Sequence, residues 1–286
     1  MKFRFIVGFS LVWMLLFSAC NPQATLAPTN APVQLAQPPT AKTAQPKAIP
    51  LNVFAAASLT TSFGEIGKAF EAEYPGITVT FNFAGSQQLA QQINSAAPAD
   101  VFASANQAQM DAVARGGRID QGASKPFVNN RLVVIYPKAN PAGIQTLQDL
   151  AKPGVKLILA DKSVPVGQYS LNFLDNAVKD PTLGAGYKDA VLKNVVSFEQ
   201  DVKSVLTKLT LGEADAGIVY TTDAATGAAG KISQLAIPDS LNVIAVYPIA
   251  VVNDSPNLPS AQAFVDYILS PDGQAILTKY GFIPVQ

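Results

Sequence analysis

Two serines stand where a strand-like segment gives way to a helix-like one. Residues 54–57, Phe-Ala-Ala-Ala, lead into Ser58, and residues 81–85, Phe-Asn-Phe-Ala-Gly, lead into Ser86. A helix start presents unpaired N–H groups and the positive end of the helix dipole, and small residues leave those groups accessible. In a parallel sheet, ligands bind at the edge that such turns occupy. The pattern predicts an anion site, although each serine alone is also a common helix N-cap.

A comparable set of residues follows in the middle of the chain. Residues 164–169, Val-Pro-Val-Gly-Gln-Tyr, predict a turn in which the amide of Val166 points outward. Val202 opens a predicted helix after Glu-Gln-Asp, and Tyr220 closes a predicted strand. Taken singly, helix capping and a half-buried sheet tyrosine explain these residues as well. Together with the two serines they supply uncharged N–H and O–H donors.

The chain of 286 residues has no histidine, which narrows the chemistry that the serines could perform. A Ser-His-Asp triad is excluded, and no lysine lies near Ser58 or Ser86 in sequence to form a Ser-Lys dyad. The residues after Gly85 also lack the second glycine of a nucleophile elbow. Histidine is also the commonest metal ligand in proteins, so its absence makes a metal site less favoured. The 20 basic residues are balanced by 20 acidic ones, so the chain has no excess of positive charge for binding a nucleic acid. We therefore expect no enzyme, no cofactor and no nucleic-acid partner.

Short β-branched segments alternate with helical periodicity from residue 51 onward, which is typical of an α/β fold with mostly parallel sheets. Two helices are marked by apolar stripes, one running from Leu59 to Phe70 and one from Val202 to Leu209. The predicted strands are 51–56, 77–83, 101–103, 131–136, 156–160, 194–198, 216–220 and 242–252.

Two of these strands, 131–136 and 242–252, are predicted to cross between lobes. The first lobe would then combine residues 51–132 with residues 248–286, and the second would comprise residues 133–247. A cleft between the two lobes is the expected ligand site.

The first 50 residues predict export and attachment to a membrane. Residues 1–19 read as a signal peptide, with a basic start and an apolar run at 5–17. Cys20 follows Phe-Ser-Ala, which resembles a lipobox although Phe17 replaces the usual branched aliphatic residue, and predicts lipidation. The alternative is an ordinary signal-peptide cysteine. Residues 20–50, rich in Pro, Ala, Thr and Gln, predict a disordered tether.

Five segments, in the same order along the chain, resemble the bacterial periplasmic molybdate-binding protein family. They are VFAAASL at 53–59, APADVF at 97–102, VPVGQY at 164–169, GIVY at 217–220 and YGF at 280–282.

The resemblance implies a type II periplasmic-binding-protein fold, in which two α/β lobes close on a bare tetrahedral oxyanion. Carried over by position, donors would come from the hydroxyls and amides of Ser58 and Ser86, the amides of Val166 and Val202, and the hydroxyl of Tyr220. Molybdenum would be held only as the oxyanion. The protein would be a monomeric extracytoplasmic lipoprotein that delivers molybdate, and by near-identity of size tungstate, to the permease of an ABC importer.

Three alternatives remain open from the residues. The same scaffold could bind sulfate, phosphate or ferric iron, although ferric sites favour several tyrosinates with His or carboxylates. A serine hydrolase would need the Ser-Lys dyad. An adhesive or sensory lipoprotein would account for the anchor and the tether, but not for the cleft motifs.

Overall fold

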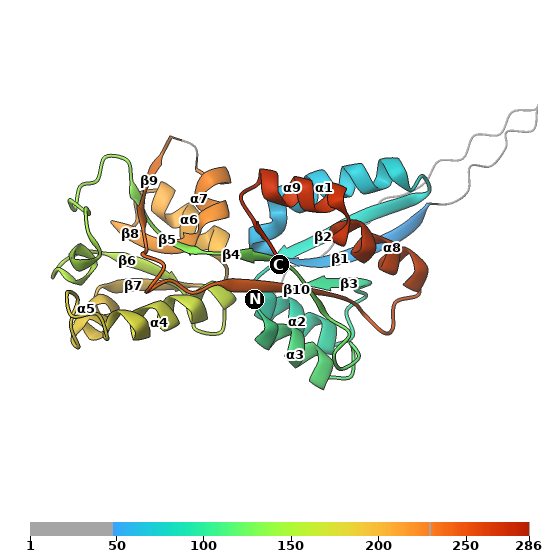
Figure 1. The fold of residues 1–286 in the computed structure, drawn as a ribbon, viewed down its shortest axis with the longest axis horizontal. Coiled ribbons are helices and arrows are strands. Elements are labelled where there is room, and N and C mark those ends of the chain that lie inside the picture. Colours follow the sequence, from blue (N-terminus) through green and yellow to red (C-terminus); the bar gives the residue numbers. More distant parts are fainter. Residues whose placement is uncertain (1–47, 229, 286) are drawn as a thin grey trace, which may run out of the picture. The chain divides into compact units, whose positions relative to one another are not determined.

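The computed structural model describes residues 48–228 and 230–285, which form two mixed sheets, one in each of two lobes (Figure 1). The first sheet has the order β11-β4-β10-β3-β1-β2 and the second β7-β6-β8-β5-β9. The strands of the first sheet are β1 (Ile49–Ala56), β2 (Ile77–Ala84), β3 (Val101–Ala103), β4 (Lys125–Asn130), β10 (Ala245–Val251) and β11 (Ile283–Pro284). Those of the second are β5 (Leu132–Pro137), β6 (Leu157–Ala160), β7 (Val195–Glu199), β8 (Ala216–Tyr220) and β9 (Ile232–Ala236).

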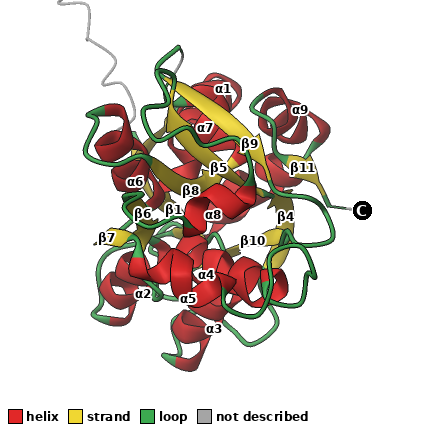
Figure 2. Ribbon diagram, turned by 90° about the vertical axis from the view of Figure 1, so that its left-hand side faces the viewer, coloured by secondary structure: helices red, strands yellow, loops and turns green. Residues whose placement is uncertain are grey.

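Helices cover both faces of each sheet (Figure 2), which buries the central strands, whereas the edge strands β2, β7 and β9 keep partly exposed residues. The first sheet lies between α1, α8 and α9 on one face and α2 and α3 on the other, and the second lies between α6 with α7 and α4 with α5. The α-helices are α1 (Thr60–Glu73), α2 (Ser86–Asn94), α3 (Gln107–Arg115), α4 (Pro165–Ala177), α5 (Tyr187–Lys193), α6 (Val202–Thr210), α7 (Thr221–Thr226), α8 (Leu258–Leu269) and α9 (Pro271–Lys279). Two short 3₁₀ helices, η1 (Ala57–Leu59) and η2 (Leu147–Ala151), complete the set. None of the helices in the described ranges is long and apolar enough to cross a membrane.

The two-lobed α/β fold is confirmed, but the expectation of mostly parallel sheets is wrong. Only the pairings of β1 with β2 and β3, and of β6 with β7 and β8, are parallel, whereas the other five pairings are antiparallel. All eight predicted strands form, with ends that differ by at most three residues. The sequence did not predict β4, β9 or β11, and each of these pairs antiparallel. Proline and polar residues interrupt β4, and Ser233 and Gln234 interrupt β9, so neither has the apolar alternation on which the prediction relied.

The chain passes between the sheets twice. Arg131 joins β4 to β5, and residues 237–244 join β9 to β10. The side chain of Asn242 ties the two passages together, because its Oδ1 accepts the N–H of Leu132 at 3.1 Å and its Nδ2 donates to the carbonyl of Leu132 at 2.9 Å. By sheet membership the changeovers fall at 131 and before 245, close to the predicted lobe limits of 132 and 248, which stay a prediction.

The predicted signal peptide and Cys20 lie outside the described residues, as does the tether up to residue 47. The end of the tether is corrected, because Ile49 and Pro50 already pair with Ile77 and Thr78 in β1.

An aromatic cluster fills the core between α1, α8 and the first sheet. The ring of Phe63 lies 6.0 Å from those of Phe81 and Phe127 and 6.1 Å from that of Phe264, and its side chain has no exposed surface. Helix α1 therefore buries the stripe that the sequence predicted for it.

We predict that Phe63→Ala lowers the free energy of unfolding by about 3 to 5 kcal/mol, because it removes a fully buried ring and leaves a cavity. Equilibrium unfolding in urea measures this loss. Leu211→Ala serves as the control: its side chain is 70% exposed, and we expect a change within about 0.5 kcal/mol. Equal losses in the two variants would contradict the assignment of Phe63 to the core.

Candidate ligand-binding site

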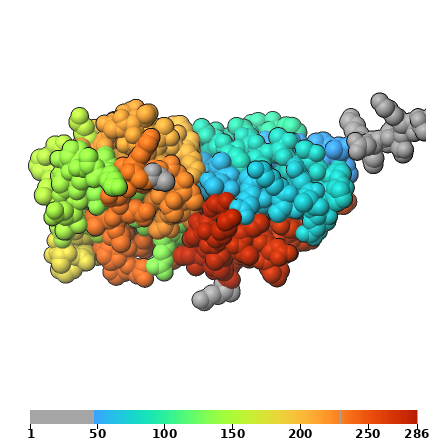
Figure 3. Space-filling model, turned by 90° about the horizontal axis from the view of Figure 1, so that it is seen from above, coloured from blue at the N-terminus to red at the C-terminus, as the bar shows by residue number. Residues whose placement is uncertain are grey.

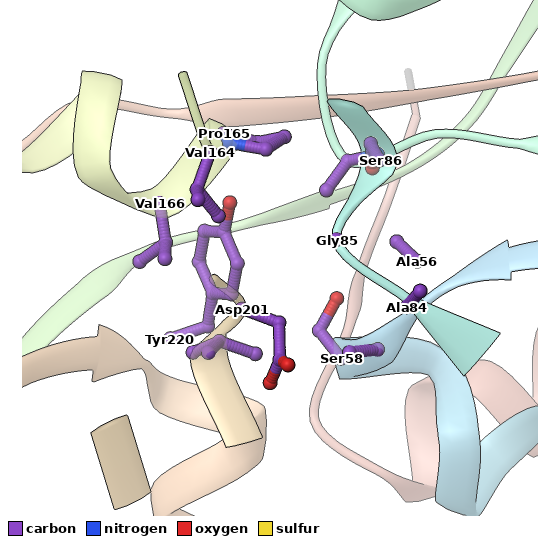
Figure 4. A pocket seen from close by; sticks show the side chains of 13 residues that line it. Ala56, Ser58, Ala84, Gly85, Ser86, Val164, Pro165, Val166, Asp201 and Tyr220 are labelled. Atoms are coloured by element: carbon purple, nitrogen blue, oxygen red, sulfur yellow. The ribbon is translucent and has the colours of Figure 1, made fainter. Parts of the chain in front are cut away.

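A small pocket, called the cavity below, lies where the two lobes meet (Figure 4). Seen from above, atoms of the two lobes are in contact over this region (Figure 3). The five residues that the sequence singled out all line the cavity: Ser58, Ser86, Val166, Val202 and Tyr220. The remaining lining residues are Ala56, Ala57, Ala84, Gly85, Ala105, Val164, Pro165 and Asp201. Most of these are small, so backbone groups reach the cavity surface.

Four helix starts converge on the cavity. Ser58 lies in η1 directly before α1, Ser86 is the first residue of α2, Val202 is the first of α6, and Val166 is the second of α4. The first amides of a helix have no partner within it, and the helix dipole adds partial positive charge there. The arrangement favours an anion.

The start of α4 differs from the turn predicted for residues 164–169. Pro165 occupies the first helical position, where its missing N–H costs nothing, so the amide of Val166 belongs to the first turn of the helix. A Cβ at Gly167 would lie 2.0 Å from the carbonyl oxygen of Asp161, so only glycine allows α4 to start this close to the end of β6. The start of a helix, not a turn, therefore holds the amide of Val166, and its role as a donor stays a prediction.

The hydroxyls of the two serines already have partners behind the cavity. Ser86 Oγ accepts the N–H of Ala105 at 3.0 Å, and Ser58 Oγ lies 2.9 Å from the hydroxyl of Tyr247. Since the backbone N–H of Ala105 can only donate, the proton of Ser86 remains available to an acceptor in the cavity.

Tyr220, which ends β8 as the sequence predicted, lies deep in the cavity wall. Its side chain is 1% exposed, and its Oη has no hydrogen-bond partner among the described residues. Burial raises the pKa of Tyr220 well above its usual value, so the phenol stays neutral and keeps its proton. A buried polar atom without a partner calls for one, and an oxyanion oxygen would supply it.

Among the described residues that line the cavity, Asp201 is the only charged one, and the sequence did not predict it there. Its carboxylate accepts the N–H of Ser204 at 2.9 Å and the hydroxyl of Ser204 at 3.0 Å, which caps α6 as its position before the helix predicted. Within residues 48–228 and 230–285, no Lys or Arg lines the cavity. Any anion bound here is therefore held by neutral donors and helix starts, which must also outweigh the repulsion from the carboxylate of Asp201.

Hydrogen bonds close the lobes around the cavity. Gln87 Nε2 donates to the carbonyl of Gln200 at 2.8 Å, and Asn106 Nδ2 donates to Gln168 Oε1 at 3.0 Å. At Gly85 a Cβ would lie 2.4 Å from the carbonyl oxygen of Gln200 in the other lobe. Small residues at the lobe junction thus permit a close approach that a larger side chain would prevent.

Comparison with known proteins agrees with this geometry. The family model for bacterial extracellular solute-binding proteins matches residues 51–283. The molybdate-binding protein ModA of Mycobacterium tuberculosis is 39% identical over 230 residues, which are 80% of this chain and 83% of that protein. The chain belongs to this family of solute-binding proteins. The resemblance that the five sequence segments indicated is thereby confirmed. Because this family binds solutes and is not enzymatic, the serine-hydrolase alternative is not supported.

Solved structures with this fold bind different ligands. The periplasmic molybdate-binding protein of Azotobacter vinelandii has a TM-score of 0.69 at 20% identity and covers 82% of this solute-binding protein and 100% of its own chain. The sulfate-binding protein SubI of Mycobacterium tuberculosis has a TM-score of 0.75 at 19% identity, covering 83% and 88%. These similarities establish the fold. The identity of the ligand has to be inferred from the residues that line the cavity.

We predict that Gly85→Ala hinders closure of this solute-binding protein while leaving each lobe folded. The backbone of Gly85, at φ −59° and ψ 136°, suits alanine, but the added methyl group would meet Gln200 when the lobes close. An overpacked contact costs about 1 to 3 kcal/mol, so oxyanion affinity should fall about 5- to 150-fold. Calorimetry measures the affinity, and small-angle scattering measures the compaction on ligand addition.

Gly64→Ala is the matched control, because a Cβ there meets no atom within 4 Å. Unchanged affinity and compaction in Gly85→Ala would show that the lobes do not close as described.

Proposed function

We propose that this protein captures molybdate outside the cytoplasm and delivers it to an ABC importer, with tungstate as a second ligand. The observation that carries the proposal is the convergence of neutral donors from both lobes on one small pocket, with no lysine or arginine among the described residues that line it. Ser58 and Ser86 come from the first lobe, and Val166, Val202 and Tyr220 from the second. The molybdate-binding relatives support the choice among oxyanions.

The proposed binding step replaces the water around a dianion with fixed N–H and O–H donors. Transferring an anion from water into protein is costly unless hydrogen bonds compensate, and bonds to a charged acceptor are roughly twice as strong as neutral ones. No cation forms a buried salt bridge with the ligand, so opening the lobes is enough to return it to water. Discrimination from the smaller sulfate would depend on cavity size and donor spacing, and tungstate would be separated little from molybdate.

Ferric iron is a weaker candidate for the same cavity. Among the described residues that line it, Tyr220 is the only tyrosine and Asp201 the only carboxylate. Tyr169, considered from the sequence, is not part of the lining, and burial raises its pKa to about 12. A site with one buried, protonated phenol does not suit Fe³⁺.

The proposal includes a lipid anchor. The signal peptide 1–19 would direct export and then be removed. A lipid on the thiol of Cys20 would fix the protein to the outer face of a membrane, and the residues that follow would hold the folded part off the surface. The protein would contact the membrane only through this anchor and would act as a monomer that docks on the permease.

The experiment that tests the ligand is parallel calorimetric titration of the chain without its signal peptide with molybdate, tungstate, sulfate and phosphate. We expect molybdate and tungstate to bind with similar affinity and sulfate and phosphate far more weakly. At a ligand concentration about a thousand times the dissociation constant, unfolding should cost roughly 4 kcal/mol more. If sulfate or phosphate stabilises the protein more than molybdate does, the proposal fails.

We predict that Ser58→Ala, Ser86→Ala and Tyr220→Phe each weaken molybdate binding by about 1 to 3 kcal/mol, because each removes one donor to a charged acceptor. Dissociation constants from calorimetry measure the effect, and urea unfolding checks the fold. Ser62→Ala is the control, since Ser62 is a buried serine of α1 whose hydroxyl donates to the carbonyl of Leu59, outside the cavity. Unchanged affinity in all three variants would place the ligand elsewhere.

A further inference from the structure

A chain of hydrogen bonds leads to Ser58 from behind the cavity. The backbone N–H of Arg131 donates to Asn130 Oδ1 at 2.9 Å, Asn130 Nδ2 faces the hydroxyl of Tyr247 at 3.5 Å, and this hydroxyl lies 2.9 Å from Ser58 Oγ. Asn130 and Tyr247 have no exposed surface, and Ser58 is 6% exposed. Neither Asn130 nor Tyr247 lines the cavity, so neither touches a ligand there.

The first bond fixes the orientation of the Asn130 amide. A backbone N–H can only donate, so the side-chain atom facing Arg131 must be the oxygen. The hydroxyl of Thr221 donates to the same oxygen at 3.0 Å. The NH₂ group therefore faces Thr222 Oγ1, at 2.9 Å, and the hydroxyl of Tyr247.

This orientation decides where the proton of Tyr247 points. An NH₂ group has no lone pair to offer, whatever the length of the contact, so the phenol cannot donate to Asn130. The hydroxyl of Tyr220 also neighbours that of Tyr247, but it makes no hydrogen bond of acceptable geometry. Among the described residues, Ser58 Oγ, at 2.9 Å, is therefore the acceptor left for the phenol. If Tyr247 donates to Ser58, the proton of Ser58 is left for the cavity.

The ring of Tyr247 cannot turn away from this position. Aromatic rings surround it, with centroids 5.7 Å away at Tyr220 and Phe282 and 6.3 Å away at Phe127. Burial also raises the pKa of Tyr247 well above its usual value, which keeps its hydroxyl protonated.

We infer that Tyr247, oriented by Asn130, is a positioning residue that forces the Ser58 hydroxyl to donate into the cavity and thereby selects an oxyanion without protons. The inference rests on the proposed function. The hydroxyl oxygen of Ser86 likewise accepts a hydrogen bond, from the N–H of Ala105, so its proton is also left for the cavity. Both serines would then present only protons, so a ligand oxygen that carries its own proton would find no acceptor at either. The one carboxylate in the described lining, Asp201, already accepts the N–H and the hydroxyl of Ser204.

The test is a double-mutant cycle of Tyr247→Phe and Ser58→Ala, with molybdate dissociation constants measured by calorimetry on the chain without its signal peptide. We expect Tyr247→Phe to raise the dissociation constant about 3- to 10-fold with Ser58 present, and less than about 2-fold in the Ser58→Ala background, because contacting residues couple. Phenylalanine keeps the packed ring, and thermal unfolding checks the fold.

The sign of the effect reports the direction of the bond. If Ser58 donated to Tyr247 instead, Tyr247→Phe would release the serine proton and tighten binding. Tighter binding, unchanged binding, or an equal loss in both backgrounds would each overturn the inference. Tyr187→Phe is the matched control, since this buried phenol donates to the carbonyl of Leu147 away from the cavity; it should leave affinity unchanged.

Selectivity gives a second measurement. Phosphate still carries a proton at neutral pH, so Tyr247→Phe should lower the preference for molybdate over phosphate. An unchanged ratio would overturn the role in selection. If the unmodified protein binds sulfate and not molybdate, the proposed function fails, while the same cycle titrated with sulfate still decides the role of Tyr247.

Discussion

A buried anion without a cation beside it is the constraint on which this structure depends. Removing charge from water costs several kcal/mol per ion even after relaxation, and a protein that offers no salt bridge must compensate with oriented dipoles. Helix starts are the densest source of such dipoles, and four of them point at one cavity. The sheets bring them there because strand ends and helix starts meet at the same edge in each lobe. The small residues around Ser58 and Ser86 follow from the same need, since a larger side chain would hide the amides.

Local sequence patterns predicted the parts of the fold that local patterns control. The eight predicted strands form, and α1 and α6 bury the apolar stripes that indicated them. The antiparallel strands were missed because β4 and β9 owe their place to partners far along the chain and not to their own alternation. Missing them made the sheets look mostly parallel. The predicted turn at Pro165 failed for a related reason, because proline followed by glycine suits both a turn and the first turn of a helix.

The residues of the site also fall into those that local sequence patterns predicted and those that they did not. Ser58, Ser86, Val166, Val202 and Tyr220 could be found because each stands at a recognisable strand end or helix start. Asp201 was recognised as a cap, but its place in the wall depends on how the lobes meet. Tyr247 gave no signal at all: it lies 189 residues from Ser58 in sequence, inside a strand, where tyrosine is common. A residue that acts on the ligand only through another side chain leaves no sequence motif when the two residues lie far apart in the chain.

The pairing of Asn242 with Leu132 has a mechanical consequence. Because one side chain holds both the N–H and the carbonyl of Leu132, the two connections between the lobes are fastened to each other. Sliding one connection past the other would break both bonds, whereas bending them together keeps both. The pairing thus favours a hinge in which both connections bend as one unit.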